Sequence, residues 1–135
     1  ICLFRSRNQI LVSEAFDSSK QDYYCRPLGG AIEFGETSRD AMLREIREEI
    51  DVEVKNLKFV GVLESIFLYE GALGHEIVFV YDAEFADENL YRKAEIDGYE
   101  SGIDARFTAR WYSLEEMGEK NLRLVPEGLA ELLEK

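Results

Sequence analysis

The sequence has few cysteines, no long apolar run and no secretory signal, and each absence excludes a class of protein. Its only cysteines among 135 residues are Cys2 and Cys25, which stand among apolar or aromatic neighbours outside any C-x-x-C motif. We expect reduced, buried thiols in a cytoplasmic protein; a disulfide and a catalytic thiol are the less favoured alternatives. Because no apolar run approaches the roughly 20 residues that span a bilayer, no membrane helix is expected.

The chain is also short of positive charge. Its 16 lysines and arginines are outnumbered by 28 aspartates and glutamates, which gives a net charge of −12. A surface with this charge repels DNA, RNA and anionic membranes at long range, so neither nucleic acid nor membrane is expected as a partner. If such a protein handles phosphate, it needs a counter-charge, and divalent cations held by its own carboxylates would supply it.

The composition predicts a single globular domain over residues 1–135, with a hydrophobic fraction of 46%. Since the chain begins at Ile1 inside an expected strand, we expect that its natural N-terminus is missing. The pattern predicts strands at 1–4, 9–16, 23–27, 57–68, 76–85 and 108–112, and helices at 38–50, 113–116 and after Pro126. This order favours an α+β fold or an α/β/α sandwich around a mixed β-sheet. The polar segment 86–106 is expected to be a long loop.

The first expected helix carries an unusual group of carboxylates. Glu48 and Glu49 follow Glu45 by three and four residues, so the side chain of each is a neighbour of Glu45 on the helix surface. Like charges at this spacing destabilise an isolated helix by roughly a few tenths of a kcal/mol per pair. A bound divalent cation would remove the conflict, because magnesium and related ions prefer carboxylate oxygens. The alternative is a solvated helix face in which Arg44 and Arg47 serve as local partners.

Two upstream residues at fixed distances favour the cation. With Gly30 and Glu36 included, the stretch resembles the signature of the Nudix hydrolase family, G-x5-E-x7-R-E-U-x-E-E-x-G-U, in which U is apolar. The matching residues are Gly30, Glu36, Arg44, Glu45, Ile46, Glu48, Glu49 and Val52. The departure is Asp51, where the family usually has a glycine in the left-handed conformation, which aspartate tolerates better than most residues. At low resolution the similarity extends over nearly the whole chain and implies a Nudix-like fold.

The resemblance implies a magnesium site in which Mn2+ can substitute. The implied metal ligands are the Gly29 carbonyl, Glu45, Glu48 and Glu49, and the three glutamates are also the implied catalytic residues. Glu45 is either a further ligand or the base that activates water. Glu36 and Arg44 are implied to brace the loop and the helix against each other.

Outside the signature the candidates are less specific. Glu100 is favoured as a further metal ligand, since family members often recruit an acidic residue from a distal segment. The alternatives are Glu88, Glu95, and Glu76 beside the only histidine, His75. Each of these carboxylates is otherwise an ordinary surface group. Arg26 is expected either to contact a substrate phosphate or to pair with a surface carboxylate.

The function implied by the resemblance is metal-dependent hydrolysis of a phosphoanhydride bond in a nucleoside diphosphate linked to another moiety. The alternative is a Nudix-fold protein that senses nucleotide metabolites without hydrolysing them. A prenyl-diphosphate isomerase is a further, less favoured possibility. Because all the carboxylates of the signature are present, both are disfavoured. The expected partner is a small nucleotide-like diphosphate. Nucleoside triphosphates, dinucleoside polyphosphates and nucleotide sugars all remain open as substrates, and a homodimer remains open as an oligomeric state. The aromatic residues Tyr23, Tyr24, Phe67 and Tyr69 could stack on a base, although core packing is their favoured role.

Overall fold

The computed structural model describes residues 1–100 and 103–134. The strands are β1 (Cys2–Ser6), β2 (Gln9–Asp17), β3 (Asp22–Pro27), β4 (Val54–Tyr69), β5 (Ala72–Phe85), β6 (Glu95–Glu100), β7 (Ala105–Tyr112) and β8 (Leu122–Leu124). The helices are α1 (Ser38–Ile50), α2 (Leu114–Glu119), α3 (Leu129–Leu133) and the short 3-10 helix η1 (Glu88–Arg92). No helix in the described ranges is both long enough and apolar enough to cross a bilayer.

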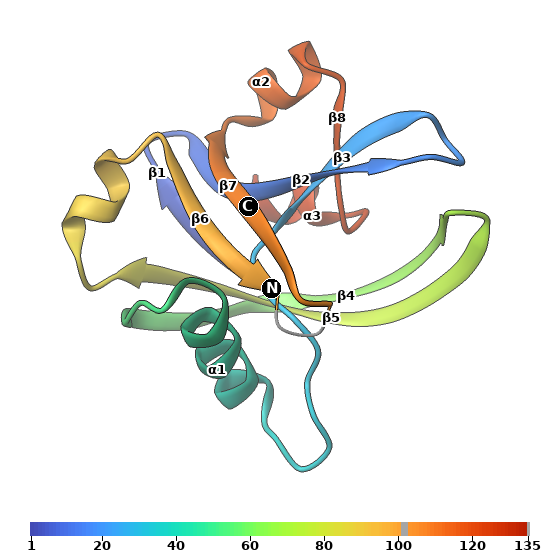
Figure 1. Cartoon of the computed structure of the whole chain (residues 1–135). Helices are drawn as coiled ribbons and strands as arrows, with labels where there is room; N and C mark the ends of the chain where they lie inside the picture. The colour runs from blue at the N-terminus through green and yellow to red at the C-terminus, as the bar shows by residue number, and fades with distance from the viewer. Residues whose placement is uncertain (101–102, 135) are drawn as a thin grey trace.

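A curled, mixed β-sheet forms the body of the protein (Figure 1). β4 and β5 form a long antiparallel hairpin, and β1 runs parallel to β5 before it turns back antiparallel into β2. β2 pairs with both β3 and β7, while β8 lies parallel to β3 and β6 lies antiparallel to β7. The expected α+β class with a mixed sheet is therefore confirmed.

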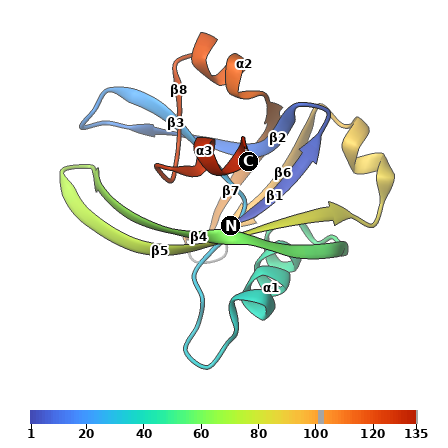
Figure 2. The same ribbon diagram turned by 180° about the vertical axis from the view of Figure 1, so that it is seen from behind.

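Helices α1 and α3 lie on opposite faces of the β4–β5 hairpin (Figures 1 and 2). On one face, Met42 and Ile46 of α1 belong to a buried cluster with Phe4 and Phe85, whose rings stack with their centroids 4.0 Å apart. On the other face, Leu129 of α3 packs against β5 in a second cluster. Burial of this apolar surface fixes α1, and with it the carboxylates of α1, against the sheet.

Local sequence determines both ends of α1. At its N-terminus, the Thr37 side chain accepts a hydrogen bond of 3.1 Å from the backbone N–H of Asp40. At its C-terminus, Asp51 adopts φ 51° and ψ 49°, and its N–H donates to the carbonyl of Arg47 at 2.9 Å. The left-handed conformation expected at Asp51 is thus confirmed, at a position where glycine is the favoured residue.

The segment 86–106, expected to be a long polar loop, mostly forms regular structure, so that prediction was wrong. It contains η1, all of β6 and the first residues of β7. The sequence of β6, EIDGYE, is not typical of a strand, because it is rich in charged residues and contains Gly98. A Cβ at Gly98 would lie 2.3 Å from the ring of Phe107, its partner on β7. The aromatic ring covers the glycine across the ladder and stabilises the pair.

Other differences concern the ends of elements. The strands expected at 57–68 and 76–85 are longer, so the β4–β5 hairpin closes at a tight turn around Gly71. The short strand β8 was not predicted, because three residues give no clear periodic signal. The terminal helix begins at Leu129, after Pro126 rather than with it.

Both cysteines are buried in the core as free thiols. Burial raises the pKa of Cys2 and of Cys25 to about 12, so both stay protonated at neutral pH. The expectation of unpaired, buried thiols is confirmed, and neither has the exposed, lowered-pKa environment of a catalytic cysteine.

Replacing Asp51 with glycine should raise the free energy of unfolding by about 0.5–1 kcal/mol, because glycine adopts the left-handed conformation without a Cβ clash. The change also removes a negative charge from the C-terminal end of α1. Urea denaturation measures the difference. Asp40→Gly is the matched control within the first turn of α1 and should destabilise the protein by about 1 kcal/mol. An Asp51→Gly protein no more stable than the parent would contradict this account.

Candidate active site

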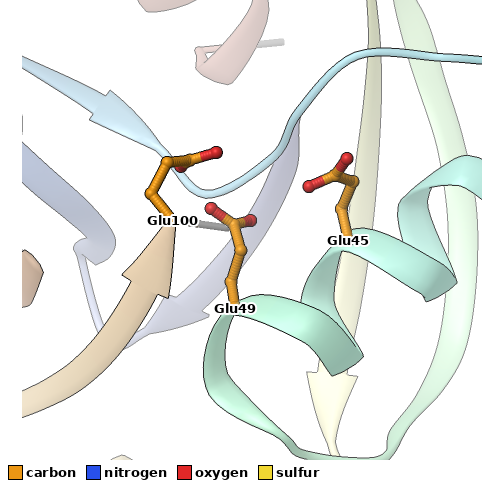
Figure 3. A group of neighbouring side chains, drawn as sticks. All are labelled: Glu45, Glu49 and Glu100. Atoms are coloured by element: carbon orange, nitrogen blue, oxygen red, sulfur yellow. The ribbon is translucent and has the colours of Figure 1, made fainter. Parts of the chain in front are cut away.

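Three carboxylates converge where α1 faces the end of β6 (Figure 3). Glu45 and Glu49 lie one helical turn apart on α1, and Glu100 is the last residue of β6. One oxygen from each side chain lies within 4.8 Å of the others. Carboxylate oxygens grouped in this way can coordinate a hard divalent cation. The pairing of β6 with β7 thus places Glu100, 51 positions beyond Glu49, beside the signature helix.

Glu49 is the most confined of the three carboxylates. Its side chain is buried, with the residue 6% exposed, and its Oε1 atom has no hydrogen-bond partner among the described residues. Burial, together with the neighbouring Glu100 and Glu45, raises the pKa of Glu49 to about 9. A buried carboxylate of this kind is unfavourable unless it is protonated or bound to a cation. The orphaned oxygen and the all-carboxylate donor set therefore fit a divalent metal ion.

Glu45 lies directly against the backbone of Gly30. A Cβ added to Gly30 would meet the Oε2 atom of Glu45 at 2.3 Å, which no real contact allows. Any side chain at position 30 would therefore force the Glu45 carboxylate to move. Burial raises the pKa of Glu45, while a hydrogen bond from Arg44 acts in the opposite direction. The tight fit between loop and helix limits where the Glu45 carboxylate can point.

Arg44 joins the loop that precedes α1 to the helix itself. Its guanidinium donates to both carboxylate oxygens of Glu36, at 2.7 and 2.9 Å, and to the carbonyl of Ala31 at 3.0 Å. It also donates to Glu45 at 2.9 Å and to Glu48 at 3.2 Å. The contact with Arg44 lowers the pKa of Glu36 to about 2. These contacts are those that a brace between loop and helix requires.

Two other predicted metal ligands, Glu48 and the Gly29 carbonyl, are not part of the group formed by the carboxylates of Glu45, Glu49 and Glu100. The Glu48 side chain is 44% exposed, pairs with Arg44, and lies outside the group of three carboxylates. The backbone of Gly29 lies beside Glu49, where its hydrogen bond lowers the pKa of that carboxyl and partly offsets the rise. The ligand roles of Glu48 and of the Gly29 carbonyl stay predictions.

Several other candidates have partners elsewhere on the surface. His75 pairs with Glu64 across the β4–β5 hairpin at 2.9 Å. Glu95 lies at the far end of β6 and pairs with Arg110 at 3.2 Å. Glu88 is exposed in η1. These positions correspond to the ordinary surface roles that the sequence also allowed.

Two cavities share Arg26 and Glu76 in their linings, and only the smaller one is also lined by a member of the carboxylate group, Glu45. A pocket of about 290 Å3 lies between α1 and β5, and its lining includes Gly30 and Glu45. A groove of about 850 Å3 lies between the β4–β5 hairpin and the paired strands β3 and β8. The groove lining includes Tyr24, Phe67, Tyr69 and Arg123. Arg26 and Glu76 line both cavities. The predicted substrate-binding residue Arg26 is therefore placed where the cavities meet.

The side of the groove formed by β3 and β8 was not predicted from the sequence. Arg123 on β8 donates two hydrogen bonds of 3.0 Å to Asp22 on β3, and its guanidinium lies 5.7 Å from the ring centroid of Tyr24. Asp22 and Arg123 are 101 positions apart, so no local pattern could have joined them. Only the pairing of β8 with β3 brings them together.

The family model described as the NUDIX domain matches residues 1–134. This chain belongs to the NUDIX family. The NAD-capped RNA hydrolase NudC of Pseudomonas putida (strain KT2440) is 33% identical over 91 residues, which are 67% of this chain and 27% of that protein. NudC of Pseudomonas fluorescens (strain Pf-5) is 33% identical over 87 residues, which are 64% and 26% of the two chains. This NUDIX chain thus spans about a quarter of the length of these curated relatives.

Solved structures share the NUDIX fold. A NUDIX hydrolase from Nitrosomonas europaea matches with a TM-score of 0.66 at 16% identity, over 98% of this chain and 82% of that one. The mutator MutT protein from Bacillus halodurans matches with a TM-score of 0.58 at 18% identity, over 99% and 77%. At these identities the similarity concerns the fold alone. It agrees with the curled mixed sheet and its few helices.

Gly30→Ala should weaken binding of Mg2+ by about ten-fold or more, because the added methyl group displaces the Glu45 carboxylate from the cluster. Isothermal titration calorimetry with MgCl2 measures the affinity. Gly118→Ala is the matched control, since a Cβ there meets no described atom within 4 Å. Equal Mg2+ affinity in parent and Gly30→Ala protein would show that this close approach does not matter.

The metal-free protein should lose stability as the pH rises from about 5 to 9, owing to Glu49. The pKa of Glu49 is about 9 in the folded protein, against an ordinary value of 4.5. Between these values the folded state keeps a proton that the unfolded chain has released, so folding becomes less favourable with rising pH. Glu49→Gln should remove this contribution. Thermal melting in chelator across this pH range measures it, and parallel profiles for parent and variant would refute it.

Proposed function

We propose that this chain is a magnesium-dependent pyrophosphohydrolase in which Mn2+ can replace Mg2+. The observation that carries the proposal is the convergence of Glu45, Glu49 and Glu100, with one buried oxygen of Glu49 unpartnered among the described residues. A donor set made only of carboxylates selects hard cations. The substrate would be a nucleoside diphosphate linked to another moiety, cleaved at its phosphoanhydride bond.

A bound divalent cation supplies positive charge to the diphosphate and lowers the pKa of a bound water. In this proposal Glu49 and Glu100 hold the cation, and Glu48 and the Gly29 carbonyl are further ligands, as the family signature implies. Glu45 either joins them or accepts the proton of the attacking water. Its raised pKa suits the second role, because a more basic carboxylate is a better proton acceptor.

The two cavities suit the two ends of such a substrate. Arg26 lines both, so a diphosphate placed beside the carboxylates would lie next to a guanidinium, which binds phosphate oxygens in a two-point geometry. The groove presents Tyr24 and Tyr69, whose rings offer stacking surfaces for a planar base. The smaller pocket beside Glu45 would take a compact second moiety.

The names of the NudC relatives add one candidate substrate. NAD is a diphosphate that joins two nucleosides, which matches a site with a cavity on each side of Arg26. The net charge of −12 opposes contact with an RNA chain, so we expect the dinucleotide rather than the RNA body to be recognised. A panel of NAD, NAD-capped RNA, nucleotide sugars, dinucleoside polyphosphates and nucleoside triphosphates separates these possibilities.

A metabolite sensor without hydrolytic activity is the alternative from another functional class. Such a protein has no need for every carboxylate of the signature, yet Glu45, Glu48 and Glu49 are all present here. The presence of all three therefore favours the enzyme.

Glu49→Gln should reduce turnover of the best panel substrate by about 10²-fold or more, equivalent to roughly 3 kcal/mol of transition-state stabilisation. Substrate binding should weaken far less, because the base and sugar contacts remain. Glu88→Gln, a change at an exposed carboxylate, is the control and should leave turnover unchanged. Chelator should abolish the parent's activity and excess Mg2+ should restore it. A parent that binds panel compounds tightly with Mg2+ and releases no product would overturn the enzyme proposal in favour of the sensor.

A further inference from the structure

Arg26 and Glu76 are the two described residues that the linings of the pocket and the groove have in common. Arg26 lies on β3, three positions before Gly29, and Glu76 lies on β5. Glu76 stands opposite Ser65 in the β4–β5 ladder, and the burial of Ser65 shows that this face of the hairpin is turned inward. A substrate that occupies both cavities therefore passes this pair.

The contact between the two side chains is weak. The Nη1 atom of Arg26 lies 3.5 Å from the Oε1 atom of Glu76, at the outer limit of a hydrogen bond, and only one such contact forms. The side chains are 37% and 42% exposed. Exposed single-point ion pairs contribute little to stability. Arg26 can therefore leave Glu76 for another anion with little loss of stability.

Arg26 is also the basic side chain best able to serve a phosphate here. Among the described residues, it is the only arginine or lysine in the lining of the pocket that holds Glu45. The groove also has Lys20 and Arg123, but Arg123 is committed to Asp22 by two hydrogen bonds. An anion near the carboxylates must therefore compete with Glu76 for Arg26.

We propose that Glu76 limits the affinity of the site for anions by competing with the substrate's diphosphate for the guanidinium of Arg26. The inference rests on the proposed function and assigns Glu76 as a specificity-determining residue. A diphosphate offers several charged oxygens and a two-point contact, so it displaces the single contact of Glu76. A monophosphate product makes fewer contacts with Arg26, so the ion pair between Arg26 and Glu76 re-forms. The exchange thus favours diphosphates over single phosphates and promotes product release.

Calorimetric titration with methylenediphosphonate, a non-hydrolysable diphosphate, in saturating Mg2+ tests the proposal without relying on turnover. Glu76→Gln should bind the probe about three-fold more tightly than the parent, the size expected for one partly exposed charge. Glu64→Gln is the matched control, because Glu64 is also on the hairpin but lines neither cavity. Its affinity for the probe should equal that of the parent. Glu76→Ala is a second variant that should bind the probe more tightly for the same reason. A thermal melting curve for each protein shows whether a change in affinity comes from altered folding.

The double variant Arg26→Ala/Glu76→Gln identifies the route of the effect. If Glu76 acts by competing for Arg26, its replacement should bring no tightening once Arg26 is absent. Tightening that persists in the Arg26→Ala background would mean simple repulsion and would overturn the proposal. Weaker Mg2+ binding by Glu76→Gln would instead make Glu76 a metal ligand and would overturn it as well. A parent that hydrolyses no panel compound, yet shows the expected affinities, would refute the hydrolase and leave this inference standing.

Discussion

The Arg44 guanidinium donates hydrogen bonds to the loop before α1, at Glu36 and the Ala31 carbonyl, and to the helix, at Glu45 and Glu48. Arg44 is the positive charge of α1 that pairs with both Glu45 and Glu48, in a chain with a net charge of −12. Because the contact with Glu36 uses two nearly parallel bonds, it fixes an orientation as well as a distance. The loop is thereby drawn close to Glu45, and this approach is what the absence of a side chain at Gly30 permits.

The local parts of the site could be predicted from the sequence, because each follows from interactions between near neighbours. The Thr37 cap, the left-handed Asp51 and the grouping of Glu45 and Glu49 on α1 all depend on residues within one or two helical turns. Glu100 was selected from a segment whose structure was predicted wrongly. Its position depends on the β6–β7 ladder, in which Phe107 of β7 covers Gly98. The groove could not be foreseen, because its wall needs β3 and β8, which are about a hundred residues apart.

Stability and the proposed metal binding oppose each other at Glu49. The apolar packing of Met42 and Ile46 holds α1 against the sheet and places Glu49 in a buried position. Without metal, the raised pKa of Glu49 records the free energy stored there. In the proposed function the same confinement would favour a cation, because the Oε1 atom of Glu49 has no hydrogen-bond partner among the described residues. The folding of the core thus prepares the electrostatics of the site.

The strand pair β6–β7 contributes Glu100 through its register, and this has an evolutionary consequence. Successive side chains of a strand point to opposite faces, so a shift of one residue in the ladder would turn Glu100 away from α1 while every backbone pair could re-form. Single-residue insertions or deletions inside β6 would therefore produce folded proteins with an incomplete carboxylate cluster. If Glu100 serves as proposed, we therefore expect relatives that keep the carboxylate cluster to keep the residue spacing within β6 as well.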